Sequence, residues 1–128
     1  MKRKPTVGKR ERFITYARDR FQCVFCRRSV LLGQLSLFDL TVDHWWPLCQ
    51  GGHPYRLRNL RTACRACNTL KGDATFDTLD DAREYIEQQR AVAAARMIEQ
   101  AAYEVGDTLH AFDWLDLEAV LWRLGVAS

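Results

Sequence analysis

The sequence predicts an α+β fold, with a small core of two strands and a helix, one helix before this core and two acidic helices after it. Three observations lead to this prediction. Apolar and polar residues alternate in "LFDLTVDH", as they do in a half-buried strand. Strong helix formers fill the segment from about Thr78 to Tyr103 without a glycine or proline. Two Cys-x-x-Cys pairs flank the middle of the chain and are spaced to hold a small core together.

The first expected element is an amphipathic helix within residues 9–21. Phe13, Ala17 and Phe21 recur there at four-residue spacing with Ile14 beside them. Basic residues occupy the opposite face. This spacing predicts that the apolar stripe is buried.

Two short strands are expected next. The alternation in residues 37–44 predicts a strand that ends at His44. A stretch rich in proline and glycine follows and indicates a turn and a loop. We expect a second strand around Trp46–Cys49 to complete a hairpin with the first.

The segment "RACNTLKGD" predicts a short helix ended by Gly72. Asn68 and Lys71 lie about one turn apart on it and are expected to face the same way. The long helix that follows has Thr78 as its expected N-cap. A further helix is expected around Trp114–Leu124.

The charge of the chain is unevenly distributed, although the net charge is only +3. Residues 1–28 carry a net +8, residues 29–75 a net +2 and residues 76–128 a net −7. The expected division is therefore a basic core domain, 1–76, and an acidic helical extension, 77–128. A basic N-terminus can be a solvated tail, but basic residues continue into the core and favour a polyanion, most simply nucleic acid. The expected nucleic-acid-binding residues in the core are Lys71, Arg56, Arg58, Arg61 and Arg65.

The sequence contains no apolar run long enough for a membrane span. Its charged start, "MKRKPTVGKRERF", lacks the apolar segment of a signal peptide. These features predict a cytoplasmic protein that does not associate with a membrane.

Four of the five cysteines form the two pairs, Cys23 with Cys26 and Cys64 with Cys67. Such pairs suit tetrahedral zinc, because each short turn presents two thiolates to one ion. Disulfides are the alternative, but they are rare in an intracellular chain. The remaining cysteine, Cys49, is expected to be a small packed apolar residue.

The distance between the two cysteine pairs indicates what the zinc does. A simple zinc ribbon separates its pairs by roughly 15–20 residues. Here 37 residues separate Cys26 from Cys64, and the insert contains "TVDHWWPLCQGG". The zinc is therefore expected to be structural and to frame a functional segment.

The combination of Asp43-His44 after a strand, Asn59 in "RNL", and Asn68 and Lys71 in "CRACNTLKG" closely resembles the HNH endonuclease family. The resemblance covers roughly residues 12–76. It implies the ββα-metal fold of that family, here with a four-cysteine zinc site. Any one of these elements would be weak alone, but together they form a specific pattern.

The resemblance also implies roles for these residues. His44 matches the general base, since an imidazole can take a proton from water near neutral pH. Asp43 and Asn68 match the two protein ligands of one divalent cation, and Asn59 matches an asparagine that braces the loop near the histidine. Lys71 and the neighbouring arginines are expected to contact phosphates.

Carboxylate and amide oxygens favour a hard cation, so the expected catalytic metal is Mg²⁺ or Mn²⁺. Side chains alternate along a strand, so Asp43 and His44 are expected on opposite faces. Both can address one phosphate only if the phosphate lies across the end of the strand or the strand twists there.

These features predict a metal-dependent DNA endonuclease. The alternatives are a zinc-containing module that binds nucleic acid without cleaving it, and an adaptor whose acidic helices recruit a partner protein or a second copy of the chain. Trp45 and Trp46 are expected to pack on the core, with stacking on bases as the alternative.

Overall fold

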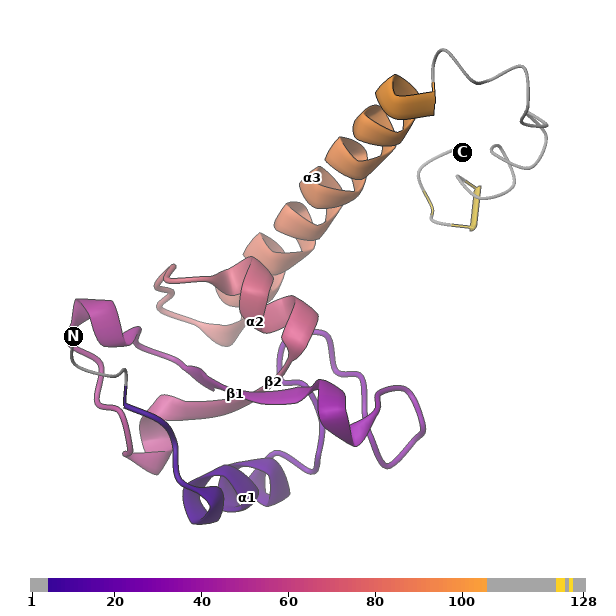
Figure 1. Cartoon of the computed structure of the whole chain (residues 1–128). Helices are drawn as coiled ribbons and strands as arrows, with labels where there is room; N and C mark the ends of the chain where they lie inside the picture. Colours follow the sequence, from indigo (N-terminus) through magenta and orange to yellow (C-terminus); the bar gives the residue numbers. More distant parts are fainter. Residues whose placement is uncertain (1–4, 106–121, 124, 126–128) are drawn as a thin grey trace. The chain divides into compact units, whose positions relative to one another are not determined.

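Helices and a two-stranded antiparallel sheet make up the computed structural model, which describes residues 5–105, 122, 123 and 125 (Figure 1). This mixture of elements confirms the α+β class. The chain divides into two units, Met1–Glu87 and Gln88–Ser128. The helices and strands are α1 (Lys9–Arg18), β1 (Leu40–His44), β2 (Leu60–Cys64), α2 (Arg65–Lys71) and α3 (Leu79–Val105).

The sheet lies between α1 and α2 in the first unit (Figure 1). Leu40 pairs with Cys64 at one end of the sheet, and His44 pairs with Leu60 at the other. β2 runs directly into α2 through Cys64, whose sulfur accepts the backbone N–H of Cys67 at 3.4 Å. The cysteine therefore caps the helix, and the register of the sheet fixes where α2 begins.

The strand that pairs with β1 is β2. The prediction of a strand around Trp46–Cys49 is therefore wrong. That segment contains a short 3-10 turn, Leu48–Gln50, because Pro47 has no N–H for a strand ladder. The two glycines that follow are required by the turn. Gly51 has a φ of 85°, and a Cβ at Gly52 would collide with the carbonyl oxygen of Trp46.

The prediction that the apolar stripe of α1 is buried is also wrong. Phe13 is 46% exposed and Ile14 is 39% exposed, whereas Thr15 and Tyr16 are buried. The Tyr16 hydroxyl donates to the Leu40 carbonyl at 3.1 Å, and the Thr15 carbonyl accepts the hydroxyl of a β2 threonine at 3.2 Å. These polar groups can be buried because the sheet backbone and side chains satisfy them.

The start of α3 follows the prediction. Thr78 caps the helix by accepting the backbone N–H of Asp81 at 3.1 Å. Ala82 and Ile86 then pack into the buried core of the first unit. The further helix expected around Trp114–Leu124 lies outside the described residues, apart from Trp122 and Arg123. Within the described part of the chain, no helix combines the length and apolarity that a membrane span requires.

Asp19 joins the end of α1 to the sheet. One carboxylate oxygen accepts the backbone N–H of Thr62 at 2.8 Å, and both oxygens accept N–H groups of Arg18 at 2.9 Å. Burial by itself raises the pKa of Asp19, but the hydrogen bonds from Arg18 and Thr62 outweigh it and lower the pKa below its usual 3.8. The ionised Asp19 carboxylate therefore stabilises the fold at pH values above its usual pKa of 3.8. This stabilisation is lost as the pH falls through the lowered pKa of the folded state.

Replacing Asp19 by asparagine is expected to lower the free energy of unfolding by about 1.5–3 kcal/mol at pH 7, because hydrogen bonds to a charged acceptor are lost. Urea unfolding followed by circular dichroism measures the change. Asp77→Asn is the matched control, since Asp77 is exposed in the same unit. Equal stability of Asp19→Asn and the wild type would contradict this role.

Candidate functional site

The four paired cysteines converge on one point. The sulfur atoms of Cys23, Cys26, Cys64 and Cys67 all lie within 4.8 Å of one another. The sulfurs of Cys26 and Cys64 are 3.9 Å apart, too far for a disulfide. A tetrahedron with Zn–S bonds of 2.3 Å has S···S edges of about 3.8 Å. The cluster therefore fits a structural zinc site.

Backbone N–H groups point to two of the four sulfur atoms. The N–H of Cys26 points to the Cys23 sulfur at 3.5 Å, and the N–H of Cys67 points to the Cys64 sulfur. Hydrogen bonds from the Cys23 and Cys67 side chains lower the pKa of the Cys64 thiol below its ordinary value. Cys49 lies apart from the cluster, in the Leu48–Gln50 turn. It is exposed, so the prediction that it packs as an apolar residue is wrong.

A second group of polar side chains lies between β1 and α2. The Asn68 amide donates its N–H to the Thr41 hydroxyl at 2.9 Å. One turn further along α2, the Lys71 ammonium lies 3.2 Å from one oxygen of Asp43 and 3.3 Å from the other. Thr41 and Asp43 are two residues apart and share one face of β1. Asn68 and Lys71 therefore face the same strand, as the helical spacing predicted.

The Lys71–Asp43 pair is fully buried. The Lys71 side chain is 0% exposed, and its ammonium also donates to the carbonyl of His44 at 3.2 Å. Burial raises the pKa of Asp43 to about 6, although the positive charge of Lys71 opposes that rise. Lys71 was expected to contact phosphates, but the structure places it beneath the surface, where it neutralises a buried carboxylate.

Two oxygen atoms in this group accept no hydrogen bond of proper geometry from the described residues. Oδ2 of Asp43 lies near the lysine, but it is buried without a hydrogen bond of proper geometry. Oδ1 of Asn68 accepts no hydrogen bond from the described residues, since only the amide nitrogen is engaged. One carboxylate oxygen and one amide oxygen form a donor set that suits Mg²⁺ or Mn²⁺, with water as the remaining ligands.

His44 is the last residue of β1, and its ring is held in one orientation. Nε2 lies 3.0 Å from the carbonyl oxygen of Pro54. A carbonyl can only accept, so Nε2 carries the proton in this contact and Nδ1 keeps a free lone pair. Nothing in the sequence singled out Pro54, because it contributes only a backbone carbonyl, which every residue has.

Asp43 and His44 point to opposite faces of β1, as strand alternation predicted. Asp43 contacts Lys71 of α2, whereas His44 lines a groove together with residues of α1. β1 ends at His44, so both side chains border the same end of the strand. Asp43 is buried on its face of the strand, whereas His44 is partly buried on the other.

Asn59 ties down the loop that follows β1. Its carbonyl oxygen accepts the N–H of Trp46 at 2.7 Å, and its amide donates to the carbonyls of Trp46 and His53 at 3.1 and 3.0 Å. This loop also contains Pro54, which orients His44. These three hydrogen bonds hold the loop against the residue that precedes β2.

The four predicted DNA-binding arginines lie in different settings. Arg56 and Arg58 are exposed. Arg61 is partly buried and stacks over Trp45 at 5.7 Å from the ring centre. Arg65 is exposed and donates to the carbonyl of Phe38 at 3.1 Å. Three of the four thus present charge at the surface, and Arg61 packs on the core.

Residues 23–74 match the family model described as HNH endonuclease. This segment contains both cysteine pairs, β1, β2 and α2. The segment therefore matches the HNH endonuclease family, as the motifs predicted, a family of nuclease-type domains that bind nucleic acid. No curated protein and no solved structure matches the chain.

Replacing Lys71 by methionine is expected to lower the free energy of unfolding by about 3–5 kcal/mol, because it leaves Asp43 as an unpaired buried charge. Urea unfolding without added divalent cation measures the loss. The double variant Asp43→Asn/Lys71→Met is expected to recover most of it, since neither partner is then charged. A single variant as stable as the wild type would show that the ion pair has no stabilising role.

Proposed function

We propose that the protein is a metal-dependent DNA endonuclease that hydrolyses a phosphodiester bond at the end of β1. One observation carries this proposal. In a segment of the HNH family, β1 and α2 place Asp43 and Asn68 in one interface, and each keeps an oxygen that accepts no hydrogen bond. His44 lies at the end of the same strand with its ring oriented by Pro54.

In this proposal each residue has a stated task. Nδ1 of His44 takes a proton from the attacking water as the new P–O bond forms. Asp43 and Asn68 would hold a divalent cation, which would supply charge neutralisation at the scissile phosphate. Asn59 keeps the loop in the position that orients His44. The P–O3′ bond breaks, so the products carry a 5′-phosphate and a 3′-hydroxyl.

Plasmid nicking tests the proposal. Supercoiled DNA is incubated with the zinc-loaded protein and either Mg²⁺ or Mn²⁺, and the same reaction without added cation is the control. We expect cation-dependent conversion to the open circle, with ends that a ligase can reseal. No conversion with any divalent cation, at a protein concentration that binds the DNA, would contradict the proposal.

A second candidate is a zinc-containing module that binds nucleic acid without cleaving it. The Lys71–Asp43 pair favours this candidate, because the lysine already neutralises the carboxylate that would bind the cation. Salt-sensitive DNA binding without cleavage in the same assay would support it.

A further inference from the structure

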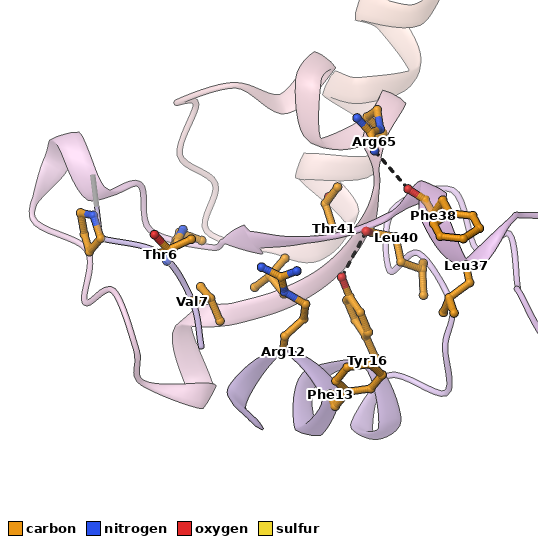
Figure 2. Close-up of a pocket in the computed structure, with 13 residues that line it drawn as sticks. Thr6, Val7, Arg12, Phe13, Tyr16, Leu37, Phe38, Leu40, Thr41 and Arg65 are labelled. Carbon is orange, nitrogen blue, oxygen red and sulfur yellow. Dashed lines mark hydrogen bonds between the residues drawn. The ribbon is translucent and has the colours of Figure 1, made fainter. Parts of the chain in front are cut away.

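A groove of about 560 Å³ opens on the α1 side of β1 (Figure 2). His44 is among the residues that line it. Its volume falls within the roughly 300–1,000 Å³ that is usual for sites that hold small ligands. The groove runs past Val42 and Leu40 toward Leu37, away from the end of β1. A ligand in it would therefore extend from the proposed reaction centre along the strand.

The charged groups of the groove suit an anion. Arg12 extends from α1 toward β1, and Arg65 approaches from the start of α2 (Figure 2). Arg65 is held by its hydrogen bond to the Phe38 carbonyl, and a guanidinium keeps further N–H donors beyond that one. None of the described lining residues is acidic. Two guanidinium groups in a lining that contains no carboxylate favour phosphate groups as partners.

The aromatic side chains of the groove suit nucleobases. Phe38 lines it with 83% of its surface exposed, and Phe13 lines it with 46% exposed. Proteins that bind single strands combine exposed aromatic rings for base stacking with basic groups for phosphates. Both faces of a base inside a duplex are covered by its neighbours, so stacking on Phe38 requires a base that is out of the duplex.

We propose that this groove binds a short unpaired segment of the DNA strand next to the phosphodiester addressed by His44. Phe38 stacks on a base, and Arg12 and Arg65 hold phosphates. The preferred substrates are then DNA molecules with a gap, flap or single-stranded end. That the bound DNA strand is also the substrate rests on the proposed function. Binding of DNA in the groove needs neither catalysis nor a divalent cation.

Fluorescence anisotropy tests the proposal with a labelled single-stranded oligonucleotide and a blunt duplex of the same sequence, in buffer without Mg²⁺ or Mn²⁺. We expect the single strand to bind more tightly. Phe38→Ala should weaken single-strand binding about tenfold and leave the salt dependence unchanged. Arg12→Gln and Arg65→Gln should each reduce the slope of log affinity against log salt by about 0.7.

Two substitutions serve as matched controls. Tyr103→Ala removes an aromatic ring that is 82% exposed, close to the exposure of Phe38, and Arg28→Gln removes an exposed arginine that does not line the groove. Effects of the same size for the controls and the groove variants would overturn the proposal, as would tighter binding of the duplex. If the groove variants weaken single-strand binding as expected but the wild type cleaves no DNA, only the nuclease function is refuted. If the wild type cleaves DNA but the groove variants bind the single strand as tightly as the wild type, only the groove proposal is refuted.

Discussion

Replacing His44 by alanine is expected to lower the rate of plasmid nicking by about 10²–10⁴-fold, the usual contribution of a general base. Zinc content and DNA affinity should stay close to wild type, because the ring is only partly buried and its one hydrogen bond is to the Pro54 carbonyl. Single-turnover nicking with saturating protein and Mn²⁺ measures the chemical step separately from binding.

Two further variants separate the role of His44 as a base from its role in the loop. His44→Gln can still donate to the Pro54 carbonyl but cannot take the proton, so it should be as slow as the alanine variant. His53→Ala is the histidine control, since this ring is exposed and accepts only backbone N–H groups of Tyr55 and Arg56. It should retain most of the activity. Wild-type rates for His44→Ala would remove the base assignment.

Replacing Cys67 by serine is expected to abolish cooperative folding of the segment around the four cysteines. Structural zinc contributes roughly 10–16 kcal/mol of binding free energy in small zinc domains. That is as large as the whole stability of an ordinary domain, roughly 5–15 kcal/mol. The core offers little to replace it, because Cys23, Cys64 and Cys67 are themselves core residues.

Metal analysis and thermal unfolding test this expectation together. The wild type should carry one zinc per chain and unfold in one cooperative transition, and Cys67→Ser should lose both properties. Cys49→Ser is the matched control, because Cys49 is exposed and lies outside the cluster. It should keep its zinc and its transition. A stable Cys67→Ser variant without zinc would mean that the cluster does not hold the core together.

Local patterns in the sequence were sufficient for the features that depend on neighbouring residues. The short helix ends at Gly72, the long helix is capped by Thr78, and the four cysteines converge. Each depends on spacing within one turn or on the geometry of a Cys-x-x-Cys pair. Strand alternation likewise predicted that Asp43 and His44 face opposite ways.

Features that depend on distant residues could not be predicted in this way. The partner of β1 is β2, which lies beyond a loop that the Gly51-Gly52 turn and Asn59 hold in place. The apolar stripe of α1 was misleading, because the Tyr16 hydroxyl finds its partner, the Leu40 carbonyl, only in the assembled sheet. Trp45 packs against the core as expected, whereas Trp46 stays 44% exposed.

The sequence by itself determined the family match and the four cysteines that cluster, and it named the residues of the proposed chemistry, because these follow from residue type and spacing. Only the tertiary structure decided how those residues are paired. Lys71 lies beneath the surface against Asp43, His44 turns toward Pro54, and Arg12 joins Arg65 in one groove. Burial and hydrogen-bond partners come from segments far apart in the chain, and they determine whether a charged side chain meets a carboxylate or a phosphate.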